Sequence, residues 1–192
     1  MLPHICEKPM GIFSRFKKKG DVNLSKSDFK TQSEDFEVLS VKVSGDFFEK
    51  FPQAKKKDNY TGKSTLITNT AILSLFGNKV KITYNPSEIE LNEDKFINQM
   101  NRNLNWIANN ESEIKIGISK KLLILKNESW LQENESELSK NEFIKRIKLT
   151  SISFFGKGNS ELIFDDGDLF WEHEIVADLN TKNKLTDVNI RG

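Results

Sequence analysis

Hydrophobic residues recur at helical spacing through the middle of the chain. The first stripe consists of Phe96, Met100, Leu104 and Ile107. These residues are separated by four, four and three positions, so they share one face of a helix that begins after the N-cap candidate Asn92. The second stripe follows Asn109-Asn110 and consists of Ile114, Ile118, Leu122 and Leu125. The pattern therefore predicts two consecutive amphipathic helices.

A third, shorter helix is predicted by its start signals. Ser139 and Glu142 have the spacing of a capping box, in which each side chain bonds the main-chain N–H of the other residue. Leu138 and Phe143 flank the box as a hydrophobic staple. We expect Phe143 and Ile147 to face the core.

Strands are predicted on both sides of these helices. The N-terminal candidates are Phe36–Val43, Ser64–Thr68, Ala71–Phe76 and Lys79–Thr83, with a turn at Gly77-Asn78. A single helical turn is predicted at Phe47–Phe51, before Pro52. The C-terminal candidates are Leu149–Phe155, Glu161–Phe164, Leu169–Leu179 and Leu185–Ile190.

This order of elements predicts an α+β fold. It has N-terminal β-strands, a helical middle of two to three helices, and a C-terminal antiparallel β-meander of about four strands. We expect residues 1–34 to be a flexible N-terminal extension and linker, because they are polar and lack a periodic apolar face. Residues 35–192 are expected to form a single domain. Met1 and Met10 are both candidate starts.

The stretch Glu161–Leu179 carries the strongest turn signal of the chain. An Asp-Gly pair within Asp165–Asp168 predicts a tight β-hairpin, in which Gly167 takes a positive φ. In the strand expected after the turn, side chains alternate between two faces. One face holds Leu169, Trp171, His173, Ile175 and Ala177, and the other holds Phe170, Glu172, Glu174 and Val176. His173 is then expected at the edge of the core, pointing away from the two glutamates.

The same hairpin resembles a known bacterial family. The run from Leu162 to Trp171, followed by His173 and Ile175, is similar to the signature of the uncharacterised family "domain of unknown function 2262". Three further segments fit it: Tyr84-Asn-Pro86, Leu125–Trp130, and Phe143–Leu149 leading into Ser151–Phe154. The resemblance covers about residues 82–192. In one departure, Glu172 and Glu174 flank the histidine where the family usually has glycine and serine. The resemblance implies a fold and a bacterial origin, and no reaction.

Composition narrows the class of protein. The net charge of +1 gives no overall field that would recruit nucleic acid, so no nucleic-acid partner is expected. The single cysteine, Cys6, leaves no internal disulfide and suits a cytoplasmic location. No apolar run reaches the roughly 20 residues of a membrane-spanning helix, so no membrane span is expected.

The candidates for catalysis lie in the acidic hairpin. They are His173, Asp165, Asp166 and Asp168. Along an extended strand His173 lies about 10 Å or more from the aspartates, which argues against a shared metal site. Gly62-Lys63-Ser64-Thr65 resembles the end of a phosphate-binding loop, but Lys57 stands where that motif needs glycine. We therefore expect no metal and no cofactor.

Two functions remain from the sequence. The first is a non-catalytic protein-binding module with an unknown protein partner, of which a toxin-neutralising immunity protein is one form. Its binding candidates are Trp171, Phe170, Glu172 and Glu174. The alternative is a metal-dependent or acid–base enzyme that uses the acidic hairpin around His173. Exposure of a tryptophan would favour the module, and a pocket joining His173 to two carboxylates would favour the enzyme. The oligomeric state stays open.

Overall fold

The computed structural model describes residues 22–38 and 62–192, and within them the chain forms one seven-stranded sheet with the strands in sequence order. The strands are β1 (Lys30–Val38), β2 (Gly62–Leu75), β3 (Asn78–Ile89), β4 (Lys148–Gly156), β5 (Asn159–Asp165), β6 (Glu174–Leu179) and β7 (Leu185–Arg191). Neighbouring strands pair antiparallel except β3 and β4, which are parallel. A parallel pair needs a long crossover, and the helices supply it.

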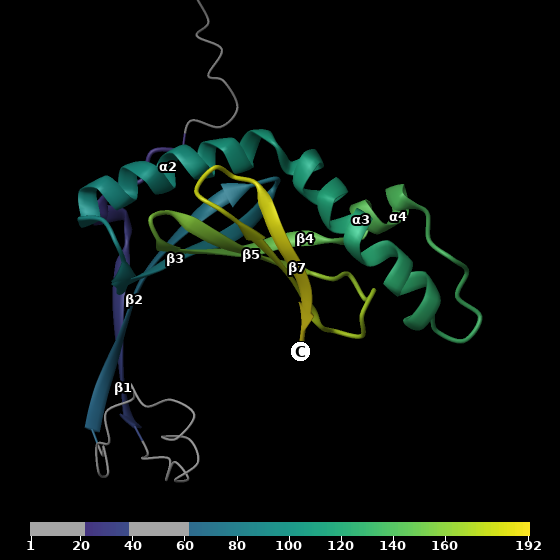
Figure 1. Ribbon diagram of the computed structural model, residues 1–192, viewed down its shortest axis with the longest axis horizontal. Helices are drawn as coiled ribbons and strands as arrows, with labels where there is room; N and C mark the ends of the chain where they lie inside the picture. Colours follow the sequence, from purple (N-terminus) through teal and green to yellow (C-terminus); the bar gives the residue numbers. More distant parts are fainter. Residues whose placement is uncertain (1–21, 39–61) are drawn as a thin grey trace, which may run out of the picture.

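The helices follow one another between β3 and β4. They are α2 (Glu93–Asn109), α3 (Glu111–Ser129) and α4 (Lys140–Arg146), and the short 3-10 helix η1 (Lys26–Asp28) precedes β1. Figure 1 shows α2 running across one face of the sheet, with α3 and α4 continuing at one end, while β1 and β2 extend well beyond the helix layer. The expected α+β class is confirmed. No helix in the described part of the chain has the length and hydropathy needed to cross a membrane.

The predicted stripe of α2 is confirmed as core. Phe96, Met100, Leu104 and Ile107 are fully buried. The helix begins as expected, since the Asn92 side chain accepts a hydrogen bond from the N–H of Lys95. The capping box that starts α4 also forms, with the Ser139 N–H donating to Glu142 Oε2 at 2.8 Å and Phe143 fully buried. Local signals therefore set both helix starts.

The buried face predicted for α3 is wrong at its last position. Ile114, Ile118 and Leu122 are buried as expected, but Leu125 is 39% exposed. The inward position is taken by Lys126, whose side chain is fully buried. A steady spacing of four residues after Leu122 leads to residue 126, and a carboxylate from outside the helix makes this burial possible.

The expected N-terminal linker is also corrected where the structure describes it. Leu24 is buried against α2, and β1 pairs with β2 from Lys30↔Thr70 onward. Two parts of the expected linker therefore belong to the domain: Val22 and Leu24, whose main-chain polar groups bond Asn105 and Asn101 of α2, and residues 30–34, which pair with β2. Residues 36–38 of the strand expected at Phe36–Val43 form the end of β1, which begins six residues earlier, and its residues 39–43 are outside the described range. Residues 1–21 and 39–61, including the helical turn expected at Phe47–Phe51, lie outside the described residues.

The first hairpin differs from the prediction only in detail. The two strands expected at 64–68 and 71–76 are one continuous strand, β2. Leu75 pairs with Asn78, so the two turn residues are Phe76 and Gly77, one position before the predicted pair. Both have positive φ, 53° and 79°, as a tight hairpin turn requires.

Candidate functional site

The segment between β5 and β6 is an eight-residue loop, Asp166–His173, and not the tight turn that the Asp-Gly pair predicts. Strand pairing stops at Asp165↔Glu174, so the strand expected from Leu169 begins five residues later. The prediction for Gly167 holds, since its φ is +60°. A Cβ at this position would lie 2.7 Å from the main-chain oxygen of Arg146. Only glycine, which has no Cβ, therefore lets the loop approach the end of α4 this closely.

The carboxylate of Asp166 organises the loop. It is 4% exposed, and its two oxygens accept hydrogen bonds from the N–H groups of Asp168 at 3.1 Å and Phe170 at 2.5 Å. Asp165 adds a shorter-range bond from the N–H of Gly167, at 2.8 Å. These side chains satisfy main-chain donors that a strand partner would otherwise satisfy, which explains why a loop replaces the ladder. Two of the catalytic candidates therefore hold the main chain.

Two hydrophobic residues anchor the loop in the core. Leu169 and Phe170 are consecutive and both fully buried, so the strand alternation that put them on opposite faces is wrong. The Phe170 ring packs edge-on against Trp130 at 5.5 Å and against Phe143 at 6.2 Å between centroids. Of the four binding candidates, Phe170 is thus a core residue, while Glu172 and Glu174 are exposed.

The outer part of the loop is conformationally strained. Asp168, Trp171 and Glu172 have φ values of 63°, 57° and 67°, in the left-handed region that non-glycine residues seldom occupy. Three such residues within eight positions persist only because the surrounding contacts determine them. Trp171 projects from this segment with 55% of its surface exposed.

Trp171 is nevertheless held in place on one side. Its ring lies 5.0 Å from that of Trp130, with the two planes inclined at 57°. Trp130 follows the end of α3 and also contacts Phe170 and His173, so four aromatic rings form one cluster. Trp130 is half-buried and packs on the fully buried Phe170, so it holds one side of the exposed indole.

His173 lies at the edge of this cluster, outside the strand in which it was expected. It is half-buried, its ring stands edge-on to Trp130 at 5.4 Å, and its Nδ1 lies 3.2 Å from the main-chain oxygen of Trp171. Gly192 lies next to the imidazole, since a Cβ on it would clash with His173 Cδ2. Within residues 22–38 and 62–192, no three His, Cys, Asp or Glu side chains are grouped so that they could hold a metal ion.

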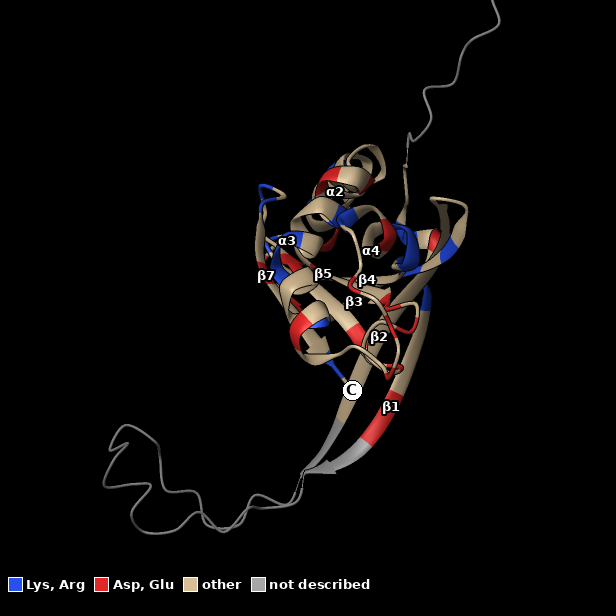
Figure 2. Cartoon of the chain, turned by 90° about the vertical axis from the view of Figure 1, so that its right-hand side faces the viewer, with Lys and Arg blue, Asp and Glu red and all other residues tan. Residues whose placement is uncertain are grey.

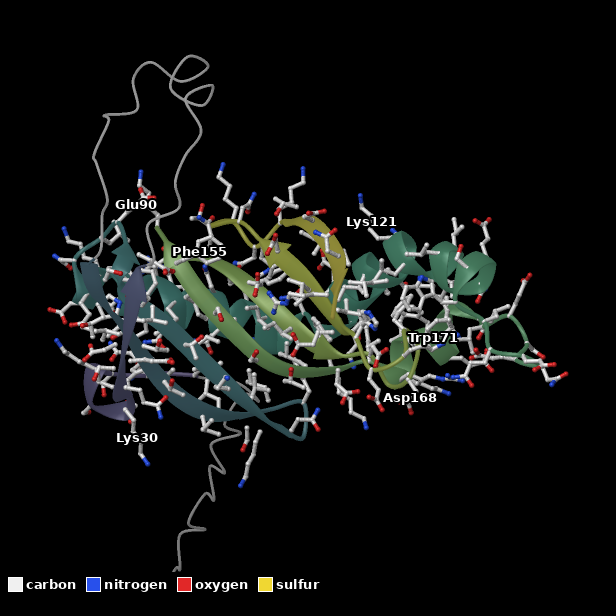
Figure 3. The ribbon with its side chains drawn as sticks, turned by 90° about the horizontal axis from the view of Figure 1, so that it is seen from below. Lys30, Glu90, Lys121, Phe155, Asp168 and Trp171 are labelled. Carbon is white, nitrogen blue, oxygen red and sulfur yellow. The ribbon has the colours of Figure 1, made fainter. Side chains whose placement is uncertain are left out.

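A hollow of about 610 Å³ opens beside Trp171. Its lining consists of Gln132, Glu135, Arg146, Asp168, Trp171 and Glu172. Figure 3 shows Asp168 and Trp171 next to each other at one end of the sheet. The opposite wall comes from α4 and from the turn after α3. The sequence did not single out that wall, because its residues join the loop only through the tertiary fold.

The far wall is fixed by an ion pair between a fully buried lysine, Lys126, and a partly exposed glutamate, Glu135. The Lys126 ammonium donates to Glu135 Oε2 and to the main-chain oxygen of Trp130, both at 2.6 Å. Arg146 approaches the other oxygen of Glu135 at 3.6 Å. The hydrogen bond from Lys126 and a second from the Gln132 N–H lower the pKa of Glu135 below its usual range. Lys126 thereby ties the end of α3, and with it Trp130, to the wall of the hollow.

Comparison with known proteins gives a family and no activity. Residues 69–190 match the model of a family described as "Uncharacterized protein conserved in bacteria (DUF2262)". The match begins earlier than the resemblance seen in the sequence and takes in β2 from Asn69. A search of curated proteins and one of solved structures each find no match.

Proposed function

Because the chain belongs to this family of uncharacterised bacterial proteins, its function has to come from the site, and we propose that it is a non-catalytic protein-binding module that recognises its partner through the Trp171 loop. In this proposal the module works in the bacterial cytoplasm. The partner inserts a side chain into the hollow beside Trp171 and covers the indole.

The observation that carries the proposal is an exposed tryptophan on a rigid support. Large aromatic residues, tryptophan above all, dominate the energy of protein interfaces, where they sit near the centre of the contact. Trp171 offers more than half of its surface to solvent, while Asp166 and Trp130 fix the main chain and the ring behind it. A side chain that is already ordered loses little entropy on binding, so more of the contact energy appears as affinity.

The strain of the loop supports the same function. Left-handed φ values at Trp171 and Glu172 cost on the order of 1–3 kcal/mol each. The contacts of Asp166 and Trp130 maintain this conformation and leave the indole exposed. Presentation of the indole to a partner accounts for that arrangement.

A photo-crosslinking experiment tests the proposal. Benzoylphenylalanine replaces Trp171 in the full chain, expressed in its own bacterium, and the control carries it at Ile124, which is exposed on α3. We expect one protein to be captured from position 171 and not from position 124. The purified partner should then bind the Trp171→Ala variant at least about 30-fold more weakly, which corresponds to about 2 kcal/mol. Equal affinity for the variant and the parent would exclude this site.

The finer form of the proposal is an immunity protein that neutralises a toxin. It predicts that the captured partner is toxic when expressed alone and harmless when co-expressed with this chain. Co-expression with the Trp171→Ala variant should restore toxicity. If the partner is harmless when expressed alone, the immunity role is rejected, and the proposal of a protein-binding module is unaffected.

A further inference from the structure

We infer that the partner presents a basic side chain, an arginine or a lysine, to the indole of Trp171. This inference rests on the proposed function and names the chemistry of the protein segment that is bound. Two segments border the hollow. Residues 130–137 carry three glutamates and residues 165–174 carry five carboxylates, and neither segment contains a lysine or an arginine, although the whole chain has a net charge of only +1.

Four of these carboxylates are occupied within the fold. Asp165 and Asp166 hold the loop main chain, Glu135 binds Lys126, and Glu174 pairs with Arg191 at 3.2 Å. The other four are exposed: Glu133, Glu137, Asp168 and Glu172. Among the described residues none of these four forms an ion pair. Figure 2 shows this side of the molecule, where acidic residues in red and basic residues in blue both occur near α3 and α4. Asp168 and Glu172 line the hollow, so they give it a negative charge that a cationic partner would neutralise.

The geometry at Trp171 favours the same partner. The ring packs against Trp130 on one side, and Trp171 is 55% exposed, which leaves indole surface for a new contact. Guanidinium and ammonium groups are attracted to the face of an indole ring, and tryptophan is the strongest aromatic partner for them. Asp168 and Glu172 line the hollow together with this ring, so a cation over the indole also finds carboxylates within the same site.

The one basic residue in the lining does not reverse this sign. Arg146 stands at the far wall, 3.6 Å from Glu135, which also pairs with Lys126. These three groups together carry one positive charge, against the two negative charges of Asp168 and Glu172 in the lining. An anionic partner, such as a nucleic acid or an acidic peptide, would meet like charge along the rim at Asp168 and Glu172. A basic protein segment is therefore the occupant that the charges fit.

Fluorine NMR of the full chain labelled with 5-fluorotryptophan tests the inference. The probe is a hexapeptide of alternating glycine and arginine. A peptide with citrulline for each arginine keeps the shape without the charge, and a peptide with glutamate reverses the charge. Trp171→Phe assigns the Trp171 resonance. We expect a saturable shift of that resonance with the arginine peptide, at least about tenfold tighter than with the citrulline peptide, and no shift at Trp106.

Matched charge variants complete the experiment. Asp168→Asn combined with Glu172→Gln should weaken the arginine peptide at least about fivefold. Glu34→Gln combined with Glu113→Gln makes the same change in net charge away from the hollow, at exposed positions on β1 and α3, and should keep the affinity within about twofold.

Three results would overturn the inference: equal binding of the arginine and citrulline peptides, tighter binding of the glutamate peptide, or no saturable shift up to about 1 mM peptide. The proposed function fails separately. In one outcome, the captured protein needs Trp171 for its affinity while the arginine peptide binds no better than the citrulline peptide. That result would keep the proposed protein-binding function and reject the inferred basic side chain. If Trp171→Ala leaves the affinity of the captured protein unchanged, the binding site itself falls.

Discussion

Asn101 on α2 binds the main chain of Leu24 with both atoms of its side-chain amide. Its Oδ1 accepts from the Leu24 N–H at 2.9 Å, and its Nδ2 donates to the Leu24 carbonyl oxygen at 2.7 Å. One turn further along α2, Asn105 makes the same pair of bonds to Val22, each at 2.7 Å. The two asparagines thus replace a strand partner for a segment that was expected to be a linker.

Removing this contact should destabilise the domain. Asn101→Ala leaves the N–H and carbonyl of buried Leu24 without partners, which should lower the free energy of unfolding by about 2–3 kcal/mol. Asn109→Ala is the control, because Asn109 is exposed and bonds only within α2. Urea titration of both variants measures the difference. A loss at Asn101 no larger than that at Asn109 would show that residues 22–24 do not belong to the cooperative unit.

The close approach at Gly167 gives a second prediction. Gly167→Ala combines an unfavourable φ with a clash against the Arg146 main chain, so we expect a loss of about 2–3 kcal/mol. Gly77→Ala is the matched control, since its φ is also positive but a Cβ there would contact nothing within 4 Å. That variant should lose only about 1 kcal/mol. Similar losses in the two variants, measured by urea titration, would mean that the packing of the loop on α4 contributes nothing.

The ion pair of Lys126 and Glu135 predicts a pH dependence. The folded state lowers the pKa of Glu135, so the unfolded state binds its proton more tightly. The contribution to stability is therefore fully present above the unfolded pKa near 4.3 and is lost as pH falls through the lower, folded value. Thermal unfolding between about pH 2 and 7 should show this fall, and Glu135→Gln should flatten it.

The same pair predicts an asymmetry between its two partners. Glu135→Gln leaves the ammonium of Lys126 buried without a carboxylate and should cost about 3 kcal/mol at pH 7. Lys126→Met fills the same space but leaves the Trp130 main-chain oxygen without its donor, while Glu135 keeps the Gln132 N–H and Arg146, so the loss should be smaller, about 1–2 kcal/mol. Urea titration of both variants tests this, and equal losses would contradict the role of the buried charge.

His173 separates the two functions that the sequence left open. A residue that packs against Trp130 and bonds one main-chain oxygen should lose about 1–2 kcal/mol on His173→Gln. Zinc added to the chelated protein should not raise its melting temperature, because the binding module needs no metal. A rise that disappears in His173→Gln would support the enzyme instead, through linkage of metal binding to folding.

The sequence by itself determined the features that depend on near neighbours. Asn92 and the Ser139–Glu142 box set the starts of α2 and α4, and the stripe from Phe96 to Ile107 set the buried face of α2. The Asp-Gly pair predicted the positive φ of Gly167. Each of these signals involves residues within one or a few turns of the chain, so spacing and residue type are enough to reveal them.

Only the tertiary structure decided where distant residues meet. Lys126 could be buried in place of Leu125 because Glu135, which lies beyond the end of α3, reaches it. Leu169 and Phe170 could both turn inward because Asp166 satisfies the loop main chain and Trp130 receives the Phe170 ring. Such contacts depend on shape and on partners far apart in the chain, which no local period encodes. The exposure of Trp171, the basis of the proposed function, is a result of this kind.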